Sequence, residues 1–529
     1  MATEKQPDPN RWSRQEVAEK MAEYDQDYLQ TPSQRQLAEQ LGVPRSTLQH
    51  WVARKKDIEA EPELVAFFES PVGVAFLHRL VLAAHLVMTL VGPGGIRLVC
   101  LFLELTGLNH FVAASYRPHW QVSVALEQAI DEFDQAEKER LGQGMEPEQI
   151  TVCEDETFHP ETCLVAIEPV SNFILLEQYA EDRKADTWTT ALTEATKILP
   201  IKVIQSTSDE GRGLLHHVKA DLGLHHSPDL FHVQHELVKG TSGALASKVR
   251  QATQTVEKAP TPAAQQALAR TTPQQQRLQQ QIREISAAYH PYDLETGAVR
   301  RAEAVSSSLQ QHFTEIETVA AEAGLSATCL DRIKKAKRVV VEMVATLTFF
   351  FLTLSAKVEA LSLAPEVEQA VYDNLVPALY LHLVAEKTQD ISQRRQLQTK
   401  AEELLAPLLT PASPFGSLEQ KQKVVIEKVA QECAELFQRS SSCVEGRNGQ
   451  LALRHHSLHR LSDRKLTALT GVHNYFVKRA DGTTAAERFF GAKPRDLFEW
   501  LLDRVDLPGR PAQKRSQPTP KYFLVPAAT

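Results

Sequence analysis

The chain has 529 residues and a formal net charge of −9, with 43% hydrophobic and 24% charged residues. Its length predicts several domains of roughly 100–200 residues each, and its composition is ordinary for globular protein. The negative charge argues against a uniformly basic nucleic-acid coat, but it leaves room for local basic patches that neutralise phosphates.

The cysteines and the apolar stretches indicate the cellular compartment in which the protein is expected. None of the six cysteines forms a CxxC pair, which argues against a disulfide framework or a cysteine zinc site and favours a reducing cytosol. The polar N-terminus lacks the apolar core of a signal peptide. Residues 80–91 and 343–356 are apolar but shorter than the ~20 residues of a membrane span, so we interpret them as buried helices.

Residues 1–60 predict a small helical DNA-binding domain. Ser13 and then Ser33 or Thr31 are placed to cap two helices, Gly42 breaks the second, and a third follows. This spacing resembles a helix-turn-helix, in which glycine permits the turn and the second helix reads DNA. An ordinary helical hairpin with solvated basic residues is the alternative. The residues predicted to contact DNA are Arg45, Ser46, Gln49, Arg54 and Lys55.

The next segments differ in their periodicity. Residues 61–149 predict a helical connector or a second DNA-binding domain. From residue 150 the order becomes strand, strand, strand, helix, strand, helix, strand, with strands expected at 150–158, 162–170, 173–179, 201–206 and 228–233. Residues 239–424 predict an all-helical segment, in which the glutamine-rich run 274–281 is an exposed helix face or a coiled-pairing surface. Residues 506–529 predict a flexible tail.

Three acidic residues lie at predicted strand ends or helix starts. Side chains alternate along a strand, so Asp155 points away from Glu154 and Glu156. Asp209 follows another strand, and the ends of adjacent parallel strands lie side by side. Glu445 must then return on a late helix against the same sheet edge. The alternative is that each acid is a surface turn residue or a helix cap.

Together these motifs resemble the DDE transposases of bacterial insertion sequences, which have a ribonuclease H-like core. The resemblance rests on Asp155-Glu156-Thr157, Asp209-Glu210-Gly211 and Glu445-x-x-Asn448, followed by 471–475 and 481–489. It predicts a multidomain α/β fold: a ribonuclease H-like mixed sheet with flanking helices, in residues 150–238 and 425–505, is split by the helical insertion 239–424.

The resemblance also implies an activity. Asp155, Asp209 and Glu445 would bind two Mg²⁺ or Mn²⁺ ions, which favour oxygen ligands, and catalyse cleavage of transposon ends and joining of 3′-hydroxyls to target DNA. Arg447, Asn448 and Arg454 would contact double-stranded DNA. A homodimer or larger synaptic oligomer, cytoplasmic and nucleoid-associated, is expected, with no membrane association. A catalytically inactive DNA-binding descendant and a nuclease without strand transfer remain alternatives.

Four histidines cluster after the second predicted helix of this region: His225, His226, His232 and His235. The pair His232-x-x-His235 permits a zinc interpretation, although no cysteine is near. His232 is placed to approach the carboxylates and contact substrate, and a packed histidine is the alternative.

Overall fold

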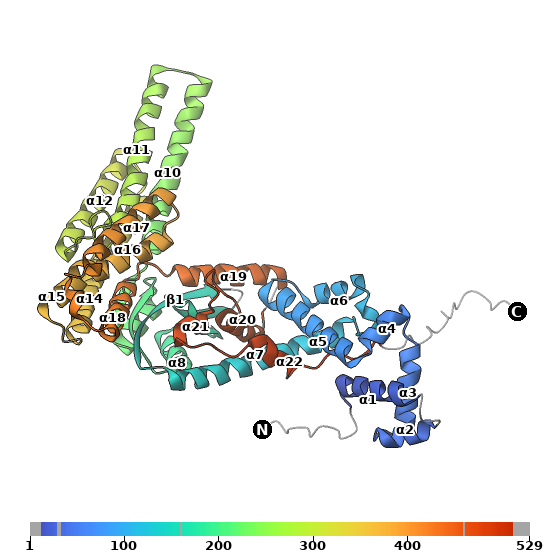
Figure 1. Ribbon diagram of the computed structural model, residues 1–529. Helices are drawn as coiled ribbons and strands as arrows, with labels where there is room; N and C mark the ends of the chain where they lie inside the picture. Colours follow the sequence, from blue (N-terminus) through green and yellow to red (C-terminus); the bar gives the residue numbers. More distant parts are fainter. Residues whose placement is uncertain (1–11, 29–32, 159–160, 459–460, 512–529) are drawn as a thin grey trace. The chain divides into compact units, whose positions relative to one another are not determined.

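The computed structural model describes the chain except for residues 1–11, 29–32, 159–160, 459–460 and 512–529 (Figure 1). The described residues are mostly helical and contain a single five-stranded mixed sheet, which confirms a multidomain α/β layout. The chain divides into two compact units, Met1–Leu141 with Ala452–Thr529, and Gly142–Leu451. The boundary at 451 falls inside residues 425–505, the predicted last part of the core.

The first unit begins with three short helices around one apolar core. Ser13 caps the first helix by accepting from the backbone of Glu16, whose side chain returns the bond. Gly42, at φ 63°, makes the turn between the second and third helices. Leu37 and Leu48 are fully buried between them. Ser33 precedes the second helix without a side-chain cap bond, and Thr31 lies outside the described residues. These helices are α1 (Arg14–Asp27), α2 (Gln34–Gln40) and α3 (Arg45–Lys56).

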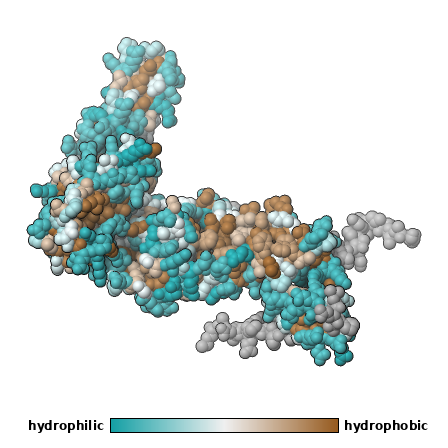
Figure 2. Space-filling model, viewed as in Figure 1, coloured by the Kyte–Doolittle hydropathy of each residue, from teal (hydrophilic) through white to brown (hydrophobic). Residues whose placement is uncertain are grey.

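The rest of the first unit is also helical. Its helices are α4 (Pro62–Phe68), α5 (Pro71–His85), η1 (Leu86–Val91), α6 (Ile96–Leu105), η2 (Leu108–His110), α7 (Tyr116–Gly144), α20 (Asp463–Tyr475), α21 (Ala485–Phe490) and α22 (Leu497–Leu502). Exposed apolar side chains of α5, η1 and α6, including Val72 and Leu105, form a brown area in Figure 2.

Two helical stretches among the described residues are long and apolar enough to span a membrane. They are Pro71–Val91 and Ala327–Glu359. About half of the first window (50%) and less of the second (39%) is buried. Each also contributes side chains to a core cluster, as core helices of globular proteins do. One or two such stretches are weak evidence for a membrane protein. We therefore continue to interpret both as helices that pack in the protein core.

The sheet lies in the second unit and has the strand order β3-β2-β1-β4-β5. The antiparallel pairs β1–β2 and β2–β3 form a meander, and β4 and β5 add in parallel on the other side of β1. Asn172, at φ 64°, lies in the turn between β2 and β3. The elements are β1 (Glu148–Phe158), β2 (Thr162–Glu168), β3 (Phe173–Ala180), α8 (Ala185–Thr196), β4 (Ile201–Ser208), α9 (Arg212–His216), η3 (His217–Asp221) and β5 (His225–Pro228).

The predicted fifth strand at 228–233 is wrong in its position. The strand is His225–Pro228, and a helix begins at Leu230. Asp229 explains the early change, because its side chain accepts from the backbone N–H of Phe231 and caps that helix. An acidic cap therefore ends a strand that an apolar run alone would have extended.

A long helical segment follows β5 and has its own apolar core, including Leu309, Phe313 and Met343. Its first two helices, drawn in green, project as a hairpin in Figure 1. The helices are α10 (Leu230–Lys258), α11 (Pro262–Ala288), α12 (Ala302–Glu322), α13 (Ala327–Arg338), α14 (Val340–Glu359), α15 (Pro365–Ala370), η4 (Val371–Leu375), α16 (Val376–Lys387), α17 (Ile391–Leu405), η5 (Ala406–Leu409), η6 (Pro414–Ser417), α18 (Gln420–Glu435) and α19 (Ser442–Leu458).

Candidate metal-binding active site

Strand β1 sends its acidic side chains to opposite faces of the sheet. Glu154 is buried on one face, where it accepts from Ser206 Oγ and lies 3.4 Å from His217 Nε2. Glu156 lies on the same face and accepts from the Trp188 indole. Asp155 points to the other face and contacts α19. The alternation therefore leaves Asp155 as the β1 acid at the candidate site.

Asp209 lies beside Asp155 because of the strand register. Glu154 pairs with Ser208 as the last pair of the parallel β1–β4 ladder, so Asp155 and Asp209 are the next residues on two neighbouring strands. Strand β4 ends there, while β1 continues beside β2 as far as Phe158. Asp209 Oδ1 accepts from the backbone N–H of Gly211 at 2.8 Å, which holds its carboxylate at the start of α9. The two predicted acids are thus neighbours at the carboxyl end of β4, although Asp155 lies within β1 rather than at its end.

Glu445 comes to this edge on the first turn of α19. The start of α19 is held to the end of β5, because Ser441 Oγ donates to Asp229 Oδ2 at 2.5 Å. The backbone N–H of Leu230 also donates to the carbonyl of Arg439 at 2.9 Å. These bonds fix where the late helix begins and therefore which residue of its first turn faces Asp155.

His232 completes a compact group of ligand atoms with two of these acids. One ligand atom from each of Asp155, His232 and Glu445 lies within 4.8 Å of the others. His232 Nε2 is 3.4 Å from Glu445 Oε1 and 3.8 Å from Asp229 Oδ2. Asp209 stands next to this group rather than inside it. A histidine therefore lies against two of the three acids predicted from the sequence, Asp155 and Glu445.

Two features of the group fit a bound cation. Burial, with the nearby carboxylates of Glu445 and Asp209, raises the pKa of Asp155 to about 7. His232 Nε2 and Asn448 Oδ1 are shielded from solvent and form no hydrogen bond among the described residues. The carboxylate oxygens suit Mg²⁺ or Mn²⁺, and the imidazole of His232 favours Mn²⁺ of these two ions. A positive charge would relieve the crowding of acids.

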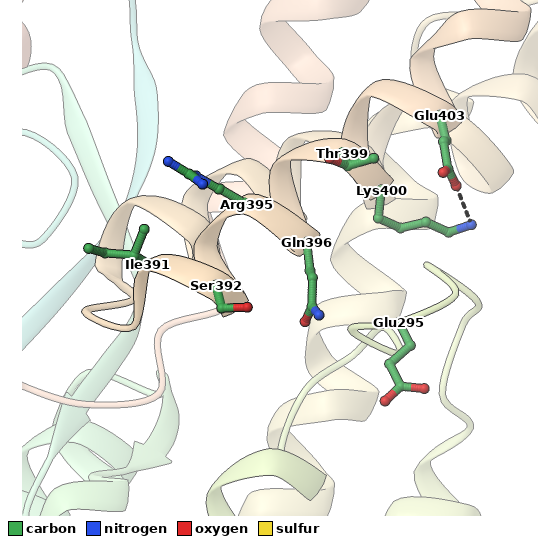
Figure 3. Close-up of a pocket in the computed structure, with 8 residues that line it drawn as sticks. All are labelled: Glu295, Ile391, Ser392, Arg395, Gln396, Thr399, Lys400 and Glu403. Atoms are coloured by element: carbon green, nitrogen blue, oxygen red, sulfur yellow. Dashed lines mark hydrogen bonds and ion pairs between the residues drawn. The ribbon is translucent and has the colours of Figure 1, made fainter.

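A cavity of about 270 Å³ opens beside the acids. Its lining includes Asp209 and Asp229, which follow β4 and β5, together with His232 of α10 and Lys335 of α13. A larger and more open hollow of about 630 Å³ lies along α17 (Figure 3). There Lys400 pairs with Glu403, and the other labelled side chains of α17 lie along an exposed helix face. Only the first of these two hollows combines convergent carboxylates with a histidine.

The three late residues predicted to bind DNA have other partners. Asn448 Nδ2 donates to Asp155 Oδ2 at 2.9 Å, so it belongs to the acidic group. Arg447 is 5% exposed and forms two bonds of 2.5 and 2.7 Å with the Glu177 carboxylate. Arg454 is buried against the carbonyls of Leu90, Val91 and Gly92. Because both guanidinium groups are buried and bonded to groups of the protein, neither is exposed to a phosphate in this structure.

Some of the residues of α3 predicted to contact DNA are exposed, and others have partners within the protein. Arg45, Ser46 and Gln49 are exposed. Lys55 forms an ion pair with Asp25 at 2.6 Å, and Arg54 donates to the carbonyl of Pro511 at 2.8 Å. DNA binding by this helix stays a prediction, with the first three residues the most accessible.

The four histidines do not form one zinc site. His225 stacks on Phe349 and bonds to Thr346, and His226 is buried. His232 alone joins the carboxylates, while His235 is exposed. The signal that could have selected His232 is its position three residues after Asp229, which places both on the first turn of a helix that starts at the sheet edge.

Comparison with known protein families gives a match over part of the chain. Residues 371–517 match the profile of a family described as a family of unknown function (DUF6399). This match covers less than a third of the chain and includes the helix that carries Glu445. No curated protein and no solved structure matches the chain.

Proposed function

We propose that the protein is a metal-dependent DNA transposase with a ribonuclease H-like core. The strand order β3-β2-β1-β4-β5, antiparallel on one side of β1 and parallel on the other, supports that core. The observation that carries the proposal is the convergence of Asp155, Asp209 and Glu445, from three distant segments, at one edge of the sheet.

Each residue has a role under this proposal. Asp155 and Glu445 would hold a divalent cation together with His232, and Asp209 would supply a further carboxylate from the adjacent strand. Bound there, Mg²⁺ or Mn²⁺ would supply activation of a water or 3′-hydroxyl and stabilisation of the leaving oxygen. Asn448 keeps the Asp155 carboxylate oriented, and Asp229 with Ser441 keeps α19 in place. Helix α3 would bring double-stranded DNA to the enzyme.

The test is cleavage of DNA that carries the sequences flanking the coding region, with Mg²⁺ or Mn²⁺. Asp155→Asn and Asp209→Ala should lose cleavage at least 100-fold, because each removes a charge from the metal group. Glu156→Gln is the matched control, since it changes the next acid of β1 on the opposite face. Transfer of a 3′-hydroxyl end into a second DNA identifies a transposase, and nicking without transfer identifies a nuclease. Binding without cleavage by the wild type would refute the proposed enzyme.

A further inference from the structure

The projecting hairpin of α10 and α11 has an unusual charge balance. Residues 237–283, which we name the arm, lie between Glu236 and Glu284 and contain seven lysines and arginines but one acidic residue, Glu257, in a chain whose net charge is −9. The arm also contains ten glutamines. Its surface is largely hydrophilic in Figure 2. This concentration of positive charge is therefore a local feature that the overall composition hides.

Most of the basic side chains of the arm are available to a partner. Arg277 is committed to Glu315 and Glu322 of α12. Lys239, Arg250, Lys258 and Arg270 are exposed, and none forms an ion pair within the described part of the chain. Because they are exposed and carry no intramolecular ion pair, their charge is not needed to hold the hairpin together.

These charges are spread along the length of α10, as contacts to a long polyanion would require. Lys239 and Arg250 are eleven residues apart, which places them on nearly the same side of α10. Lys258 is nineteen residues from Lys239, which places it ~28 Å further along the helix and about 100° round its axis. Glutamine, serine and threonine side chains between them can donate to phosphate oxygens.

The composition of the arm selects among possible partners. No tryptophan, tyrosine or phenylalanine occurs between residues 232 and 288. Base stacking on a single strand, anchoring in a protein interface and insertion into a membrane surface all rely on such residues. Backbone contact to a duplex does not, because it depends on charge and on hydrogen-bond donors.

We propose that the arm binds the phosphate backbone of double-stranded DNA without reading its sequence. This inference rests on the proposed function in one respect: the arm would hold DNA that flanks the segment bound at the acidic site, since α10 begins at that site with His232. The binding itself is independent of any cleavage and can be measured separately.

The test compares two full-length variants of equal charge. The arm variant is K239Q/R250Q/K258Q/R270Q, and the control is R301Q/R395Q/K421Q/K428Q, whose side chains are exposed elsewhere in the same unit. Both have a net charge of −13. The probe is a fluorescent 40-base-pair duplex of arbitrary sequence, titrated at several salt concentrations. Circular dichroism and thermal unfolding check that both variants fold.

The arm variant should bind at least tenfold more weakly at 0.15 M salt, and its salt dependence should fall by about 2–4 in slope, because up to four phosphate contacts are lost. The control should bind like the wild type. Equal binding by the arm variant and the control would overturn the inference, as would no duplex binding by the wild type. Equal competition by double-stranded RNA would refute the assignment to DNA.

Measuring cleavage by the wild type and DNA binding by the arm and control variants tests the two proposals separately. Weakened binding in the arm variant, with no cleavage by the wild type, supports the arm and refutes the enzyme. Cleavage by the wild type, with arm and control variants binding alike, supports the enzyme and refutes the arm.

Discussion

Asn448 donates a hydrogen bond to Asp155 Oδ2 at 2.9 Å, although 293 positions separate the two residues. Asn448→Asp should place a further carboxylate against Asp155 and destabilise the metal-free protein by roughly 1–2 kcal/mol through like-charge repulsion. Added Mn²⁺ should then raise the thermal midpoint more than it does for the wild type. Asn448→Ala serves as the control, and equal Mn²⁺ shifts in the two variants would contradict a cation at this position.

His232 should contribute directly to cation binding. His232→Ala should weaken Mn²⁺ binding at least tenfold, as judged by calorimetry, because one ligand of the group is removed. His235→Ala is a close control, since His235 is exposed three residues further along the same helix. Equal Mn²⁺ affinity of the two variants would show that His232 is a packed side chain.

Arg447 and Glu177 should stabilise the fold as a buried pair. Arg447→Met should cost about 3–5 kcal/mol, because it removes the guanidinium group that pairs with the buried Glu177 carboxylate. The double variant Arg447→Met with Glu177→Met should recover much of that loss. Urea unfolding of the single and double variants measures both values. A double variant as unstable as the sum of the two single variants would argue against coupling.

The histidine pair of the first unit predicts a pH dependence. His85 Nε2 lies 2.9 Å from His119 Nδ1, and burial, with the nearby charges of His119 and Lys465, lowers the pKa of His85 to about 3. The unfolded chain takes up a proton below about pH 6.5, while the folded chain does not until about pH 3. Stability contributed by the neutral side chain is therefore present above pH 6.5 and is lost as the pH falls.

The expected loss between pH 7 and pH 5 is about 2 kcal/mol for His85 alone. Hydrogen exchange of α5 and α7 at these two pH values measures it. His85→Gln should flatten the dependence, whereas His110→Gln should not, because His110 is exposed. An unchanged slope in His85→Gln would place the sensitivity elsewhere.

Local pattern was enough to predict the sheet and the side of it that carries Asp155. Alternation along 150–158 placed Asp155 opposite Glu154 and Glu156, and the placement of Asp209 followed from parallel pairing. The cap bond of Ser13 was likewise readable from four adjacent residues. Each of these conclusions depends on neighbours in sequence or on one strand pairing.

The surroundings of Arg447, Arg454 and His232 could not be predicted, because they depend on contacts between residues far apart in the sequence. The buried roles of Arg447 and Arg454 are set by Glu177 and by the carbonyls at the end of η1, and no local signal distinguishes them from surface arginines. His232 entered the acidic group because Asp229 stopped a strand and started a helix. The cap bond of one side chain, Asp229, therefore determines the position of a histidine whose place the local sequence pattern does not fix.

The bond between the Leu230 N–H and the Arg439 carbonyl closes the helical insertion at its base. More than two hundred residues leave the sheet edge and return to it at this one point. Loop-closure entropy changes slowly with length, so lengthening or shortening the hairpin near residues 259–261 should barely alter how α19 meets the sheet. The reach of the arm can therefore vary in evolution or by engineering while the spacing of the acids stays constant.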